Sequence, residues 1–69
     1  MSQQSLLMVE DSLSMAAVYK AYLKDTDYRV RIVTDLQGAR SEIERMTPDI
    51  LMLDVELPDG SGLDLLAEV

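Results

Sequence analysis

Short apolar runs alternate along the chain with segments in which apolar residues recur every three or four positions. The first run, residues 6–9, is too short for a helix and does not alternate with polar residues, which is typical of a strand buried on both faces. The next segment, residues 12–24, has the spacing of an amphipathic helix. Its predicted buried stripe consists of Met15, Val18, Tyr19, Tyr22 and Leu23.

The second half of the chain continues this alternation. Residues 29–33 read Arg-Val-Arg-Ile-Val, which predicts a strand near a sheet edge with both arginines facing water. A second helix is expected to begin after Thr34 or Asp35 and to end before Pro48. The remaining predicted segments are a strand at residues 50–53, a loop rich in turn residues at 57–62 and the opening of a third helix at 63–69.

This order of strands and helices predicts an α/β fold with right-handed crossovers and a parallel sheet. In the flavodoxin-like, doubly wound order, the first strand lies between the second and the third. Three strands make only part of such a sheet and leave the third as an open edge, through which the chain could form a homo-oligomer. We therefore expect residues 1–69 to be the N-terminal part of a single domain, with no second domain in the chain.

The composition is that of a small folded protein with an acidic surface. Of the 69 residues, 48% are hydrophobic, and thirteen acidic against six basic residues give a net charge of -7. Such a charge repels phosphate backbones and anionic membranes, so we expect neither nucleic acid nor membrane as a partner of this segment. Cysteine is absent, and residues 1–9 lack the features of a signal peptide, which together favour a cytoplasmic location.

Three acidic residues follow two of the predicted strands. Glu10 and Asp11 come directly after the first strand, and Asp54 comes directly after the third. Neighbouring parallel strands end at the same edge of a sheet, so these side chains are expected to converge where the strand order reverses. Like charges are costly there unless a cation shares the site, and Mg²⁺ prefers oxygen ligands. The pattern predicts a magnesium site, with Asp54 as a candidate nucleophile that forms an aspartyl phosphate.

These acids belong to a longer pattern. Glu10-Asp11 after an apolar strand, followed by the segment Asp54-Val55-Glu56-Leu57-Pro58-Asp59-Gly60-Ser61-Gly62, resembles the receiver domain of two-component response regulators. The resemblance covers essentially the whole chain, but only the first half or so of a complete receiver. Residues 9–23 are similar to receivers of the LuxO type, which occur in enhancer-binding transcription regulators of quorum-sensing phosphorelays.

The resemblance implies a role for each acidic position. Asp54 matches the phosphoacceptor, and Asp11 matches the acid that binds magnesium directly. Glu10, where many receivers have Asp, matches the partner that acts through a bound water. Glu56 matches the position whose backbone carbonyl completes the metal shell. The implied phosphoryl donor is a histidine kinase or a histidine phosphotransfer protein, and the domain is a self-phosphorylating acceptor, not a turnover enzyme.

Two residues of the family pattern have no counterpart in these 69 residues: the hydroxyl residue after the fourth strand and the lysine after the fifth. We therefore expect the isolated chain to bind magnesium weakly and to be phosphorylated poorly or not at all. The alternative function is a non-phosphorylated receiver-fold interaction module, or an inactive fragment that acts through oligomerisation.

Two other site types fit the residues less well. A phosphatase of the haloacid dehalogenase type needs Asp-x-Asp directly after its first strand, where Glu10-Asp11-Ser12 stands. A calcium-binding loop that began at Asp54 would need a glutamate at the position of Leu65.

Overall fold

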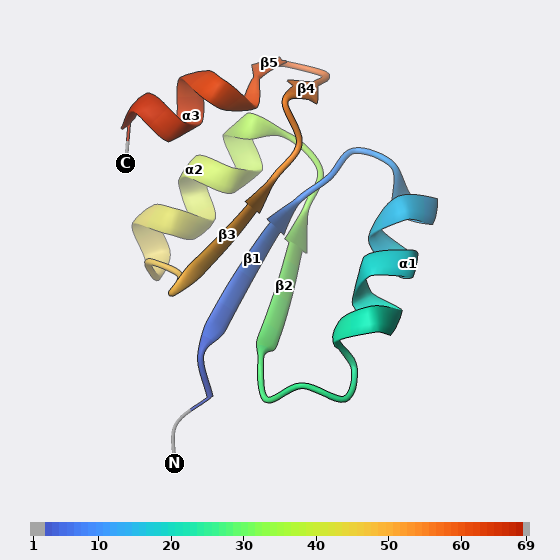
Figure 1. Ribbon diagram of the computed structural model, residues 1–69. Helices are drawn as coiled ribbons and strands as arrows, with labels where there is room; N and C mark the ends of the chain where they lie inside the picture. The colour runs from blue at the N-terminus through green and yellow to red at the C-terminus, as the bar shows by residue number, and fades with distance from the viewer. Residues whose placement is uncertain (1–2, 69) are drawn as a thin grey trace.

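The computed structural model describes residues 3–68, which form a parallel three-stranded sheet with helices on both of its faces (Figure 1). The elements in chain order are β1 (Ser5–Val9), α1 (Leu13–Leu23), β2 (Arg29–Val33), α2 (Leu36–Arg45), β3 (Ile50–Leu53), β4 (Glu56–Leu57), β5 (Gly60–Ser61) and α3 (Gly62–Glu68). The predicted end of the third helix, Val69, lies outside the described residues.

The sheet has the strand order β2-β1-β3, with both pairs parallel. In the shared register, Leu7 of β1 lies opposite Arg31 on one side and Leu51 on the other. The predicted flavodoxin-like arrangement of three strands, two helices and the start of a third is confirmed. Within residues 3–68, β3 pairs only with β1, so it is an open edge of the sheet, as β2 is on the other side.

The central strand divides the core into two layers. Leu6 and Met8 point toward α1, whereas Leu7 and Val9 point toward α2 and α3, because successive side chains of a strand face opposite sides. All four side chains are at most 2% exposed. The α1 layer is completed by Ala16, and the other layer contains Leu36, Ala39, Leu57 and Leu65. Burial on both faces explains why this strand is an uninterrupted apolar run.

Helix α1 turns a different face to the sheet than its spacing predicts. Ala16 is its buried residue, and Tyr19 and Leu23 pack beside it. Met15, Val18 and Tyr22 were expected in the buried stripe but are 42%, 45% and 79% exposed, so that part of the prediction is wrong. The helix carries apolar residues on most of its sides, so their spacing does not single out the sheet-facing side.

Arg31 does not face water, which also corrects the sequence-based expectation. Its side chain is 15% exposed and donates from Nη1 to Glu42 Oε2 at 2.6 Å and from Nη2 to the Met46 carbonyl at 3.2 Å. Arg29, two residues earlier on the same strand, is exposed as expected. Arg31 is covered because the end of α2 lies over it, and a cation is favoured next to the free carbonyls of a helix C-terminus.

The ends of the helices are set by short polar side chains. Ser12 caps α1 by accepting a hydrogen bond from the Met15 amide, and Asp35 caps α2 by accepting one from the Gly38 amide. The loop predicted at residues 57–62 overlaps a short antiparallel pair, β4 with β5, and α3 begins at its last residue. No helix in the described part of the chain is long and apolar enough to cross a membrane.

Candidate functional site

Two parallel ladders place the acidic residues at one end of the sheet. The Glu10 amide donates to the Val33 carbonyl at 3.0 Å, and the Asp54 amide donates to the Val9 carbonyl at 3.0 Å. The hydrogen bonding between neighbouring strands therefore continues one residue past the end of β1 and of β3. As a result, the backbone of both acids is fixed by the sheet.

The carboxylates of Glu10, Asp11 and Asp54 meet at this end of the sheet. One oxygen of each lies within 4.8 Å of the oxygens of the other two. Glu10 and Asp54 are half-buried, whereas Asp11 is exposed. The convergence expected from the strand order is therefore present in the structure.

Backbone amides orient two of these carboxylates. Glu10 Oε1 accepts a hydrogen bond from the Ser12 amide at 3.1 Å, at the point where α1 begins. Asp54 Oδ1 accepts one from the Glu56 amide at 3.4 Å. These two hydrogen bonds therefore orient the Glu10 and Asp54 carboxylates at the end of the sheet.

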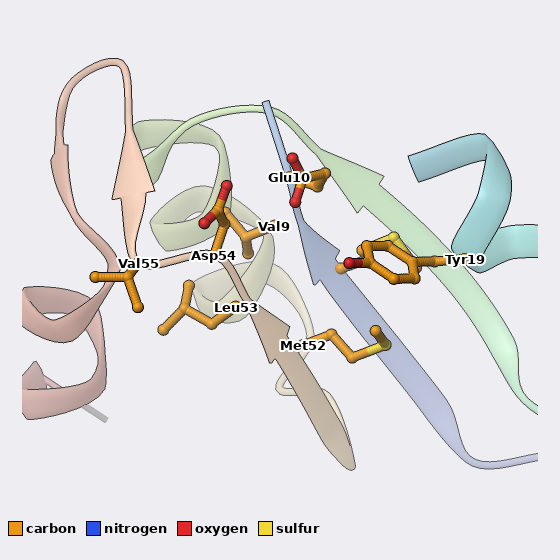
Figure 2. Close-up of a pocket in the computed structure, with 8 residues that line it drawn as sticks. Val9, Glu10, Tyr19, Met52, Leu53, Asp54 and Val55 are labelled. Atoms are coloured by element: carbon orange, nitrogen blue, oxygen red, sulfur yellow. The ribbon is translucent and has the colours of Figure 1, made fainter. Parts of the chain in front are cut away.

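Two hollows border the acidic group. The first, of about 300 Å³, is lined by Met8, Val9, Glu10, Tyr19, Met52, Leu53, Asp54 and Val55. Figure 2 shows the carboxylates of Glu10 and Asp54 at the same end of this hollow, with the ring of Tyr19 reaching in from α1. A shallow depression beside it is lined by Asp11, Asp54, Val55, Glu56, Leu57 and Pro58. Asp54 borders both, so it is open to a ligand from either side.

Glu56, predicted to contribute its backbone carbonyl, lies on β4 at the edge of the depression. Its side chain is exposed. The turn that carries it closes tightly, because the Gly62 amide donates to the Val55 carbonyl at 2.6 Å. A side chain at Gly62 would collide with the Asp54 carbonyl oxygen. The absence of a Cβ at this position therefore allows the turn to fold back on the phosphoacceptor candidate.

The acidic group lacks a basic partner in the described part of the chain. The ion pairs there join Arg31 and Arg45 to Glu42, and Arg40 to Glu68, and none reaches the three converging carboxylates. Grouped carboxylates without a basic neighbour repel one another, and a cation relieves that repulsion. An all-oxygen donor set of this kind suits a hard cation such as Mg²⁺. The residues therefore fit the metal that the sequence pattern predicts.

Comparison with known proteins now identifies the family. The family model of the response regulator receiver domain matches residues 6–69. The chain belongs to the response regulator receiver family. Receivers are signalling modules of two-component systems. The motif in the sequence and the fold both agree with this family.

Its similar relatives include LuxO regulators. The chain is 44% identical over 62 residues to the regulatory protein LuxO of Vibrio cholerae and 39% identical over 62 residues to the luminescence regulatory protein LuxO of Vibrio campbellii. Each match covers 90% of this chain and 14% of the relative. The transcriptional regulatory protein DpiA of Escherichia coli is 36% identical over 67 residues, covering 94% of this chain and 30% of that protein.

A solved structure gives the same result in three dimensions. The signal receiver domain of a putative LuxO repressor protein from Vibrio parahaemolyticus superposes with a TM-score of 0.93 at 42% identity. The match covers 96% of this chain and 51% of that one. The predicted resemblance to receivers of the LuxO type is confirmed, and the chain spans about half of the solved receiver.

Two residues, one at the site and one in the turn beside it, were not assigned a role from the sequence. Tyr19 was interpreted as a packing residue, yet it lines the hollow beside Glu10 and Asp54. Asp59 was noted only as part of the turn motif, yet its carboxylate binds the first turn of α2. No local signal marks either role, because each depends on contact between segments far apart in the sequence.

Proposed function

We propose that Asp54 accepts a phosphoryl group from a histidine-containing donor, with Mg²⁺ held by Glu10, Asp11, Asp54 and the backbone carbonyl of Glu56. The observation that supports this most is the convergence of three carboxylates within 4.8 Å at the switch point of the sheet. Membership of a family whose members take phosphoryl groups from histidine kinases supports the choice of donor.

In the proposed reaction, an oxygen of the Asp54 carboxylate attacks the phosphorus of a phosphohistidine. The bond between phosphorus and the imidazole nitrogen breaks, and its electron pair stays on the nitrogen, which takes up a proton. The product is an acyl phosphate on Asp54 and a neutral histidine on the donor. Mg²⁺, when bound, supplies positive charge against the carboxylates and the transferred group.

The chain's own residues position the nucleophile. The Asp54 amide is tied to β1, and the Glu56 amide holds Oδ1. The carboxylate is thereby fixed next to Glu10 and Asp11 before a donor arrives, which lowers the ordering cost of the reaction. The domain receives one phosphoryl group and changes state, so it is a switch and not a turnover enzyme.

We further propose that residues 1–69 correspond to the N-terminal part of a single receiver whose phosphorylation controls an attached or partner output. The match covers 51% of the solved receiver, which supports the interpretation of this chain as part of one domain. The names of the relatives point to transcription regulation. The similarity of this chain to LuxO proteins makes a quorum-sensing phosphorelay the favoured setting.

Transfer of labelled phosphate tests the proposal. The chain is incubated with Mg²⁺ and either a phosphorylated histidine phosphotransfer protein or acetyl phosphate, and the label is localised by mass spectrometry. We expect slow, low-yield labelling that hydroxylamine removes, as for an acyl phosphate. D54N should abolish the label, whereas D64N, which removes one exposed charge on α3, should keep it. Equal labelling of D54N and the unmodified chain would refute the assignment of Asp54.

An interaction module without phosphorylation is the second candidate, and the open edge of β3 favours it. Within residues 3–68 this edge has no neighbouring strand, and Val55, Leu63 and Leu66 are 51%, 58% and 56% exposed. Such an edge can pair with a second copy of the chain. Sedimentation of the unmodified chain and D54N distinguishes the candidates, since an edge-driven dimer would form equally in both.

A further inference from the structure

The carboxylate of Asp59 is bound to the beginning of α2. Oδ1 accepts a hydrogen bond from the Leu36 amide at 2.8 Å, and Oδ2 accepts one from the Gln37 amide at 3.1 Å. These partners lie 23 and 22 residues earlier in the chain. The contact therefore joins the loop after β3 to a separate helix.

Helix α2 already has a cap of its own. Asp35 accepts the Gly38 amide at 2.7 Å, so Asp35 and Asp59 together satisfy the free amides of residues 36–38. The two carboxylates differ in origin. Asp35 is local to the helix, whereas Asp59 belongs to the segment that carries Asp54 and Glu56.

Packing next to Asp59 supports the same contact. Leu36 and Leu57 belong to one buried cluster, which joins the first turn of α2 to β4. Gly60 has a φ of +148°, and a Cβ there would lie 2.8 Å from Leu36 Cδ1. Only glycine combines that backbone conformation with such a close approach. The β4–β5 hairpin is thus held on α2 by a bidentate carboxylate and by apolar contact.

The other end of the hairpin is tied to the acidic group. Gly62 donates to the Val55 carbonyl, and Glu56 donates to Asp54 Oδ1. A short run of contacts therefore leads from α2 through Asp59 and β4 to Asp54. Movement of the hairpin away from α2 would also shift Glu56, whose amide binds Asp54 Oδ1 and whose carbonyl is a metal ligand in the proposed function.

We propose that Asp59 is a positioning residue, which fixes the β4–β5 hairpin on α2 and thereby holds Glu56 against Asp54 in the geometry that binds the cation. This inference rests on the proposed function of Asp54. The hydrogen bonds from Leu36 and Gln37 also lower the pKa of the Asp59 carboxyl, so it is charged and able to accept both at neutral pH.

Hydrogen exchange and magnesium titration of D59A and D35A test the proposal in the 69-residue chain. Each variant removes one carboxylate from the same helix end, so the change in charge is matched; Asp59 accepts two amides there and Asp35 accepts one. We expect faster exchange of the Gly62 and Glu56 amides in D59A but not in D35A. We also expect the magnesium dissociation constant to rise about ten-fold in D59A and to change much less in D35A.

D59N adds a milder variant, should D59A fail to fold. Asn keeps one acceptor oxygen for Leu36, so its exchange rates and dissociation constant should lie between those of D59A and the unmodified chain. Equal Gly62 exchange in D59A, or in D59N, and D35A would overturn the role of Asp59. A chain that shows no magnesium response at all would instead overturn the proposed function, while the exchange comparison would still decide the role of Asp59.

Discussion

At the scale of single residues, Gly62 shows how tightly the turn after β3 is built. A Cβ here would collide with the Asp54 carbonyl oxygen and lie 2.9 Å from Leu53 Cγ. Because the first obstacle is backbone, it cannot move aside as a side chain would. The turn must therefore open if any larger residue replaces this glycine.

We expect G62A to lower the free energy of unfolding by about 1–3 kcal/mol, as overpacking commonly does. Urea denaturation followed by circular dichroism measures it. G38A is the matched control, since its Cβ meets only side-chain atoms, Asp35 Oδ1 at 2.9 Å and Val33 Cβ at 3.4 Å, and alanine favours helix. Its stability should stay within about 1 kcal/mol of the unmodified chain. A larger loss in G38A than in G62A would contradict this account of the turn.

The converging carboxylates could be predicted from the sequence, but other residue contacts could not. Glu10, Asp11 and Asp54 stand directly after apolar runs, and strand order alone brings such positions together. Arg31 and Asp59 make their contacts with residues 11 to 23 positions away. Nothing in their local sequence indicates those partners, because the partners are set by how α2 packs on the sheet.

At the scale of elements, strands were easier to predict than helix faces. The apolar runs of β1 and β3 are short and do not alternate with polar residues, which is typical of strands buried on both faces. Helix α1 carries exposed Leu13, Val18 and Tyr22 beside buried Ala16, so its periodicity has no single direction. The β4–β5 hairpin has two residues in each strand, too few to show a period of two.

Helix α1 makes a direct test of its buried face possible. Ala16 is 3% exposed against the sheet, so A16L should overpack this contact and lower the free energy of unfolding by about 1–3 kcal/mol. Tyr22 is 79% exposed, so Y22K should change it by less than about 0.5 kcal/mol. Urea midpoints compare the two. A greater loss in Y22K would restore the face predicted from the sequence.

At the scale of the whole molecule, acidic groups link stability to pH. The hydrogen bonds from Arg45 to Glu42 and from Arg40 to Glu68 lower the pKa of each glutamate, and backbone hydrogen bonds from Leu36 and Gln37 lower that of Asp59. A lowered folded-state pKa means that the unfolded chain binds protons more readily. These groups therefore stabilise the fold above their unfolded pKa of about 4, and that stabilisation is lost as pH falls through the lowered values.

The Arg40–Glu68 pair, which joins α2 to α3, isolates one such contribution. E68Q removes the charge, so it should be less stable than the unmodified chain at pH 7. The difference should shrink as the pH falls below about 4, because Glu68 is then protonated in the unmodified chain too. Urea midpoints at pH 7, 5 and 3 measure it. A difference that grew with falling pH would have the wrong sign.

The central claim concerns the whole chain: its sheet brings Asp54 next to Glu10 and Asp11, and we propose that these carboxylates bind Mg²⁺. Amide-resolved NMR of the 69-residue chain titrated with Mg²⁺ tests this most directly. We predict dispersed signals, with Mg²⁺-dependent shifts centred on Glu10, Asp11, Asp54 and Glu56. Binding should be weak but saturable, and the shifts should be lost in D54N. Collapsed signals, or shifts spread over all acidic residues and unchanged in D54N, would contradict the claim.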